Sequence, residues 1–224
     1  TVTGTNDAPV VATADVTGAV TEQGTPAGDL TDGGTIAFTD VDLTDTHDIA
    51  PTITASAGAL GELTADVSTD TVGGLGGEIT WDYNVAASAV EYLAVGETKV
   101  ESFTLTLNDG HGGTVERTID VTVTGTNDAP VVATADVTGS VTEQGTPVGD
   151  LTDSGTIAFT DVDLTDVHLV SATGTPVGSV LGTLTAVKDS DTTGTGTGGQ
   201  LTWTYTAPAV AFEYLAAGET KVES

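Results

Sequence analysis

One nine-residue stretch, Thr-Gly-Thr-Asn-Asp-Ala-Pro-Val-Val, occurs twice without change, at 3–11 and at 124–132. The residues after each occurrence are also alike, at an offset of 121 residues that becomes 122 at Trp81 and Trp203. Self-similarity at a fixed period indicates stacked modules, and a unit of this length can bury a core of its own. We therefore expect the strand end of a preceding copy at 1–4, a first repeat at 5–125 and a second repeat at 126–224.

Each repeat alternates apolar and polar residues with a period of two, which is typical of strands. Phe103, Leu105 and Leu107 share one strand face, and Asp109-Gly110 marks a hairpin after them. We predict a helical turn at 86–93 and seven strands in repeat 1, at 10–21, 35–40, 49–57, 61–67, 77–85, 99–108 and 114–124. Seven short strands separated by turn signals predict an all-β fold, two tandem Greek-key β-sandwiches.

Repeat 2 stops at Ser224, before the counterparts of 103–124, so we expect it to lack its last two strands. A sandwich without two strands exposes apolar faces and open edges. We expect this repeat to be locally disordered or to be completed by strand exchange with another copy.

The charge balance excludes several partners. Thirty-three acidic residues face four basic ones, which gives a formal net charge of −29. Such a chain repels phosphate backbones and anionic membrane surfaces, so nucleic-acid binding is not expected. The sequence has no run of about 20 apolar residues, so direct membrane insertion is not expected either. There is no Cys, which excludes disulfides and thiolate metal sites. The chain starts inside the repeat pattern, so the lack of a visible signal peptide is uninformative.

If the chain runs up and down through seven strands, loops from distant parts of the sequence lie at the same end of the sandwich. Carboxylates cluster in these loops. Both side chains of Asp40-Val-Asp42 point the same way in an extended chain. Ca²⁺ takes six to eight hard oxygens from several loops, so it suits such a cluster. The alternative is that these residues only form turns and cap loops. The candidate Ca²⁺ ligands are, at the leading end of repeat 1, Asn6, Asp7, Asp40, Asp42, Asp45 and Asp109; at its trailing end, Glu22 and Glu97; and at the joint with repeat 2, Asn127, Asp128, Asp161, Asp163 and Asp166.

Enzymatic motifs are missing from the sequence. The three histidines, His47, His111 and His168, have no nucleophile motif beside them. We expect His47 and His168 to be solvent groups or to support the acidic loop from behind. The loop after Asp40 is not an EF-hand, because no Gly stands at its sixth place. The sequence therefore predicts no enzyme.

The motifs together resemble the VCBS repeat, a module of large secreted bacterial adhesins related to the RTX exoproteins. The matching stretches are 38–47, Trp81-Asp-Tyr83, 92–98, Asp109-Gly-His-Gly112 and the Thr-Gly-Thr-Asn-Asp-Ala-Pro ends. The resemblance implies an Ig- or cadherin-like sandwich, export to the cell surface by type I secretion and stiffening by Ca²⁺. The expected function is a non-enzymatic extender that contacts neighbouring repeats and supports cell adhesion or biofilm formation. The alternative is a module that binds a surface glycan or protein through its variable loops.

Overall fold

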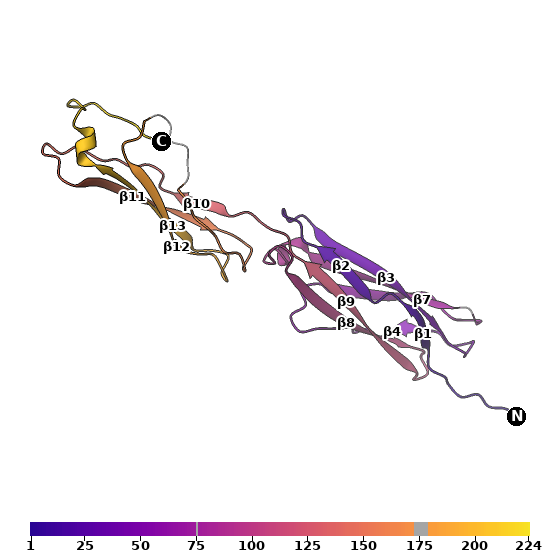
Figure 1. The fold of residues 1–224 in the computed structure, drawn as a ribbon. Helices are drawn as coiled ribbons and strands as arrows, with labels where there is room; N and C mark the ends of the chain where they lie inside the picture. The colour runs from indigo at the N-terminus through magenta and orange to yellow at the C-terminus, as the bar shows by residue number, and fades with distance from the viewer. Residues whose placement is uncertain (75, 173–178) are drawn as a thin grey trace. The chain divides into compact units, whose positions relative to one another are not determined.

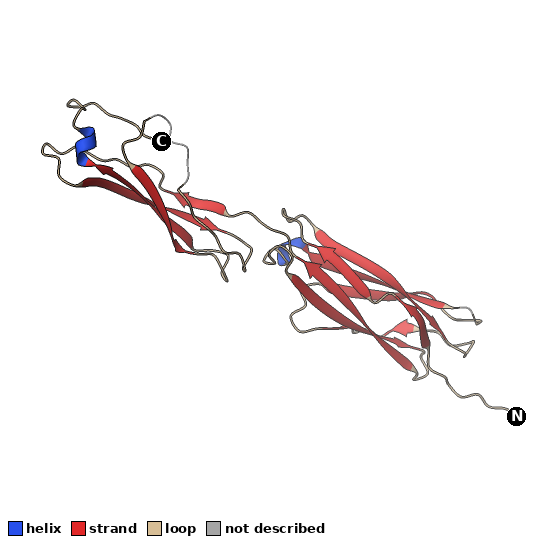
Figure 2. Ribbon diagram, viewed as in Figure 1, coloured by secondary structure: helices blue, strands red, loops and turns tan. Residues whose placement is uncertain are grey.

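The computed structural model describes residues 1–74, 76–172 and 179–224, which form two compact units, Thr1–Asn127 and Asp128–Ser224. Strands make up most of the regular structure in both units (Figures 1 and 2). None of the helices in the described ranges is long and apolar enough to cross a membrane.

The first sheet of unit 1 has four antiparallel strands in the order β1-β3-β7-β6. These strands span Val10–Ala14, Asp29–Thr39, Gly77–Ala86 and Glu62–Thr69. The second sheet has the order β2-β9-β8-β4, and β5 also pairs with β8. Its strands span Thr17–Thr21, Thr114–Thr124, Thr98–Asn108, Asp48–Ile49 and Thr54–Ala55.

This strand order is that of an immunoglobulin-like sandwich. Four strands corresponding to A, B, E and D form one sheet, and strands corresponding to G, F and C form the other. The first strand contributes to both sheets, because β1 pairs with β3 and β2 runs parallel to β9. The predicted all-β sandwich is therefore confirmed.

The core of unit 1 lies between the two sheets. Burial alternates along β7, so that Ile79, Trp81 and Tyr83 all point inward. Phe103 and Leu105 of β8 are also buried and belong to the same cluster. The period-two pattern predicted this face because successive side chains of a strand point to opposite sides.

Three predicted strands differ from the structure. The strand expected at 35–40 is longer, since β3 begins at Asp29. The strand expected at 10–21 is two strands, since the chain changes sheets between Ala14 and Thr17. The strand expected at 49–57 is broken into β4 and β5, and Pro51 lies in the gap. Proline has no N–H to donate to a ladder, so it interrupts a strand. The predicted helical turn is a short 3₁₀ helix, η1, at Ala87–Ala89.

Unit 2 repeats the first sheet in the order β10-β11-β13-β12, with the same antiparallel pairing. Its strands span Val131–Ala135, Asp150–Thr160, Gly199–Pro208 and Thr183–Ser190, and η2 spans Ala209–Phe212. Within the described part of this unit, no strand matches β8 or β9. Part of the segment in which the two repeats diverge, at 173–178, lies outside the described residues.

Candidate metal site

The leading end of repeat 1 consists of the N-terminal segment, the loop that follows β3 and the hairpin between β8 and β9. Asn6 donates a hydrogen bond from Nδ2 to Asp109 Oδ2, at 2.9 Å. The Asp7 N–H donates to Asp42 Oδ2 at 2.7 Å, and the Asp42 N–H donates to Asp40 Oδ1 at 2.8 Å. Residues from three distant parts of the sequence therefore meet here.

Asp109 is fully buried and shapes the hairpin. Its Oδ1 accepts hydrogen bonds from the N–H groups of His111 and Gly113, at 2.8 and 2.9 Å. The Asn6 amide and these backbone donors lower the pKa of the Asp109 carboxyl, although burial opposes them. Asp109 therefore has a loop-capping role, whether or not it also binds an ion.

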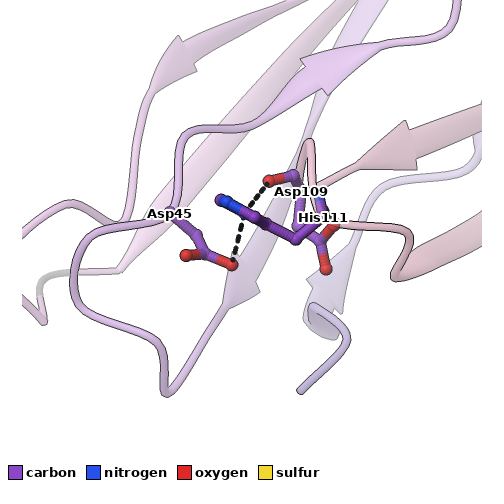
Figure 3. Close-up of side chains that lie close together, drawn as sticks. All are labelled: Asp45, Asp109 and His111. Carbon is purple, nitrogen blue, oxygen red and sulfur yellow. Dashed lines mark hydrogen bonds and ion pairs between the residues drawn. The ribbon is translucent and has the colours of Figure 1, made fainter. Parts of the chain in front are cut away.

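Asp45 and His111 complete one possible ligand group with Asp109 (Figure 3). One potential ligand atom of each residue lies within 4.8 Å of the others. Asp45 Oδ2 is buried, accepts no hydrogen bond from any described residue and lies 3.4 Å from His111 Nδ1. The His111 side chain is 62% exposed, so solvent reaches this group from the hairpin side.

His47 lies behind this loop and is buried, which corrects the expectation that it could be a solvent group. Its Nδ1 lies 2.7 Å from Asp70 Oδ1, and its Nε2 lies 3.1 Å from Asp40 Oδ2. Burial of the ring lowers the pKa of His47, but hydrogen bonds to Asp70 and Asp40 outweigh burial and raise it overall. His47 thus holds the Asp40 carboxylate in place, and the role of Asp70 was not anticipated from the sequence.

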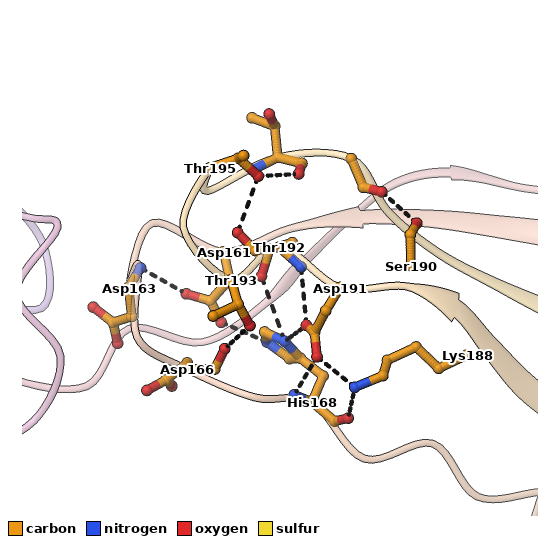
Figure 4. Close-up of polar contacts among 12 residues, drawn as sticks. Asp161, Asp163, Asp166, His168, Lys188, Ser190, Asp191, Thr192, Thr193 and Thr195 are labelled. Atoms are coloured by element: carbon orange, nitrogen blue, oxygen red, sulfur yellow. Dashed lines mark hydrogen bonds and ion pairs between the residues drawn. The ribbon is translucent and has the colours of Figure 1, made fainter.

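The same arrangement recurs within repeat 2. The Asp128 N–H donates to Asp163 Oδ2 at 2.9 Å, and the Asp163 N–H donates to Asp161 Oδ1 at 3.0 Å. His168 lies between Asp161 and Asp191, with contacts of 2.9 and 2.7 Å (Figure 4).

In repeat 2 a lysine side chain, that of Lys188, lies behind the acidic loop. The Lys188 ammonium donates to Asp191, and this hydrogen bond helps to lower the pKa of the Asp191 carboxyl. The position of Lys188 is occupied by Val67 in repeat 1.

Asp163 has a carboxylate oxygen that no described residue of the acidic loop contacts through a hydrogen bond. It is fully buried, and its Oδ1 has no hydrogen-bond partner among the described residues. Burial raises the pKa of the Asp163 carboxyl, and the charges of Asp166, Asp128 and Asp161 raise it further, against the hydrogen bond from the Asp128 N–H. Like charges gathered in this way favour a bound proton or cation.

The trailing end of repeat 1 contains Glu22, which is buried and accepts a 2.7 Å hydrogen bond from the Thr126 N–H. Oxygens of Glu22 and Glu91 lie within 4.8 Å of one another. Sequence reasoning missed Glu91, which follows the 3₁₀ helix. Glu97 accepts a 3.3 Å hydrogen bond from the Ala94 N–H and so closes its own turn. Asn127, another predicted ligand, has an exposed side chain.

The donor set fits a hard cation. Asp45 and Asp163 each present a buried carboxylate oxygen that accepts no hydrogen bond from a described residue. Apart from the His111 ring, the other candidate ligands at the leading ends are carboxylates and the amides of Asn6 and Asn127. Such oxygens are the ligands that Ca²⁺ takes in flexible geometry, whereas Mg²⁺ demands a stricter octahedron. The ligation itself stays a prediction, because other oxygens of this set, such as Asp42 Oδ2 and Asp163 Oδ2, accept the backbone hydrogen bonds that shape the loops.

A scan of protein-family models finds no match to this chain, and a search of curated proteins finds none. Membership of the VCBS family therefore stays a prediction. Solved structures with similar features include the N-terminal domain of PorA, with 14% identity and a TM-score of 0.30, covering 52% of this chain and 96% of that one.

Cadherin-like domains 1 to 4 of zebrafish RET share 13% identity at a TM-score of 0.31, covering 93% of this chain and 45% of that one. Domains 5–6 of the S-layer protein SbsC share 17% identity at a TM-score of 0.25, covering 89% and 85%. The immunoglobulin-like assignment rests on the strand order of unit 1, and not on these similarities.

Proposed function

We propose that the chain is a non-enzymatic structural repeat of a secreted bacterial surface protein, in which Ca²⁺ bound at the ends of each repeat stiffens the array. The observation that carries this proposal is the acidic loop at the leading end, which recurs in both repeats with the same hydrogen bonds. In each repeat, an Asp of the Thr-Gly-Thr-Asn-Asp-Ala-Pro stretch donates its N–H to the second Asp of Asp-Val-Asp.

The position of this hydrogen bond supports a role at the joint between repeats. Asp7 and Asp128 belong to the stretch that starts each repeat, and the carboxylates that they contact are those of Asp42 and Asp163. An ion on these carboxylates would fix the start of one repeat against its own first loops. Glu22 accepts the Thr126 N–H and holds the same stretch from the preceding repeat.

The mechanism follows from linkage between ion binding and folding. Without Ca²⁺ the carboxylates repel one another, so the chain resists compaction and stays competent for export. Outside the cell, millimolar Ca²⁺ favours the folded and stiff array. Sites with the dissociation constants of extracellular modules, about 10⁻⁴ to 10⁻³ M, each contribute about 1–3 kcal/mol, so several sites must act together.

Thermal unfolding of the whole chain in 5 mM CaCl₂, 5 mM MgCl₂ and chelator tests the proposal. We expect Ca²⁺ to raise the melting temperature by several degrees, since about 1 kcal/mol shifts the melting temperature of a domain of about 120 residues by roughly 4 °C. Small-angle scattering should show a longer and stiffer particle with Ca²⁺ than with chelator. If chelation changes neither measurement, the ion proposal is wrong.

Matched variants test which carboxylates are responsible for the rise in melting temperature with Ca²⁺. The double variant Asp42→Asn/Asp163→Asn removes one candidate ligand from each repeat and should lose much of the response to Ca²⁺. The control Asp66→Asn/Asp150→Asn removes one exposed carboxylate from each repeat and should keep the response. An equal loss in both variants would indicate general charge screening in place of specific sites.

A further inference from the structure

A groove opens in repeat 1 between the edges of the two sheets. Its volume is about 550 Å³, and its walls are the β4–β5 segment on one side and β6 on the other. Ile49 and Ile53 are half-buried along one wall, and Leu63 and Phe103 are buried beneath it. The floor of the groove is therefore apolar.

One wall of this groove is an unpaired strand edge. β6 pairs with β7 alone, and its eight residues make it the longest edge strand of the unit. Within the described ranges, no backbone hydrogen bond joins β6 to any element but β7. Its outward N–H and C=O groups are a ready template for another strand. The opposite wall contains Pro51 and is broken, so it offers no comparable ladder.

The rim of the groove carries negative charge. Asp48, Glu62 and Asp66 are exposed at its lining, and none of the described lining residues is basic. Charged side chains on an open edge oppose pairing with an edge of like charge. Copies of this chain are all strongly acidic, so they are poor occupants, whereas a cationic strand would be attracted.

Repeat 2 differs at this edge. β12 is the counterpart of β6 and is likewise the edge of its sheet, but Thr183 and Val187 stand where repeat 1 has Glu62 and Asp66. The chain therefore contains an edge of the same strand type without the two carboxylates.

We propose that the groove beside β6 binds an extended cationic segment of another protein by strand addition. Backbone hydrogen bonds to β6 hold the segment, its apolar side chains alternate into the floor of the groove, and its basic side chains face Glu62 and Asp66. Strand addition is an established mode of peptide recognition, in which the backbone provides affinity and alternate side chains provide specificity. This inference does not depend on Ca²⁺.

The test uses the whole chain and a capped ten-residue peptide that alternates lysine and valine, labelled for fluorescence anisotropy. The control peptide has proline in place of the two central valines, because proline cannot form the ladder. Both are titrated in CaCl₂ and in chelator. Hydrogen–deuterium exchange then compares the amides of 62–69 with those of 183–190.

We expect the alternating peptide to bind under both conditions and to slow exchange at 62–69 but not at 183–190. Asp66→Lys should weaken binding about fivefold, through one lost attraction and one added repulsion. Glu116→Lys makes the same charge change at an exposed position on β9 and should weaken binding less than about twofold. Both substitutions are on the surface, and circular dichroism checks that the fold is kept.

Four outcomes would overturn the proposal. The first is no binding of the alternating peptide. The second is equal binding of the proline control, which would indicate a purely electrostatic association. The third is equal weakening by Asp66→Lys and Glu116→Lys. The fourth is a lack of protection at 62–69 when the peptide is bound.

Discussion

The hydroxyl of Tyr83 donates a 3.0 Å hydrogen bond to Glu101 Oε2 inside the sandwich of repeat 1, where both residues are fully buried. Glu101 also accepts the N–H groups of Leu60 and Gly61, at 2.7 and 3.0 Å. The carboxylate therefore joins the turn before β6, the strand β7 and the strand β8. Burial and the charge of Glu101 raise the pKa of Tyr83 well above its usual value, which keeps the hydroxyl protonated as a donor.

The pair recurs in repeat 2, where Tyr205 donates to Glu223 at 2.8 Å. Burial and Glu223 raise the pKa of Tyr205 to about 12. The Leu181 N–H donates to the same carboxylate, as the Leu60 N–H does in repeat 1. A carboxylate that accepts a tyrosine hydroxyl and two successive backbone N–H groups is thus common to the two repeats, and it is buried in repeat 1 and half-buried in repeat 2.

Removal of the Tyr83 hydroxyl should destabilise repeat 1. Tyr83→Phe leaves Glu101 buried with one donor fewer, so we expect a loss of about 1–3 kcal/mol in the free energy of unfolding. The measurement is urea unfolding followed by Trp81 fluorescence in a Trp203→Phe background, which leaves one tryptophan. Tyr92→Phe, at the other tyrosine of repeat 1, is the control and should cost less. Equal costs would mean that the hydrogen bond contributes nothing.

Sequence reasoning succeeded where a periodic pattern carried the information. The strand at 114–124 was predicted to the residue, because its alternation is long and a glycine-rich hairpin precedes it. The break of the third strand also has a signal in the sequence, because Pro51 has no N–H to donate to a ladder. Glu101 lies on the same face of its strand as Phe103, Leu105 and Leu107, because successive residues alternate between the two faces. Its inward direction could therefore also have been predicted. Its partners could not, because they depend on how two sheets pack.

The candidate site was predictable in part for the same reason. The up-and-down order of the strands predicted that Asn6, Asp42 and Asp109 lie at one end of the sandwich. In the structure Asn6 donates a hydrogen bond to Asp109, and the neighbouring Asp7 donates one to Asp42. Asp70 escaped prediction because it follows β6 and reaches the acidic loop only through His47. A contact made through a third residue leaves no spacing signal in the sequence.

The stability of repeat 1 should depend on pH through His47. A pKa raised above 6.5 means that folding favours the protonated ring. The stabilisation is therefore fully present below about pH 6.5 and is lost as the pH rises through the pKa of the folded state. We expect the stability advantage of the natural chain over His47→Gln to shrink from pH 6 to pH 9, by at most about 1.4 kcal/mol per pH unit.

This experiment is done in chelator, so that ion binding does not contribute to the pH dependence. The control is His111→Gln, at a ring that is largely exposed. A pH-independent difference between the natural chain and His47→Gln would contradict the role assigned to the Asp40–His47–Asp70 contacts.

Substitution of Asp45 should have opposite effects with and without Ca²⁺. In chelator, Asp45→Asn removes a buried charge beside Asp109 and so leaves the stability of repeat 1 unchanged or higher. In 5 mM CaCl₂ the same change removes a ligand, and we expect a loss of about 1–2 kcal/mol. The measurement is thermal unfolding with Trp81 as the probe. Asp48→Asn, at an exposed residue of β4, should show neither effect. A cost that is the same in both buffers would assign Asp45 a purely structural role.

The repeated Thr-Gly-Thr-Asn-Asp-Ala-Pro stretch offers a matched pair of glycines. A Cβ at Gly125 would lie 2.1 Å from the Leu93 carbonyl oxygen and 2.5 Å from that of Ala94, while a Cβ at Gly4 would meet nothing within 4 Å. The Gly125 N–H also donates to the Glu97 carbonyl at 2.9 Å, which fixes the end of β9 against this turn. Gly125→Ala should therefore force the backbone apart and cost about 1–3 kcal/mol in the unfolding of repeat 1. Gly4→Ala should be close to neutral. Urea unfolding in the Trp203→Phe background compares the two, and an equal effect would show that the end of β9 adapts freely.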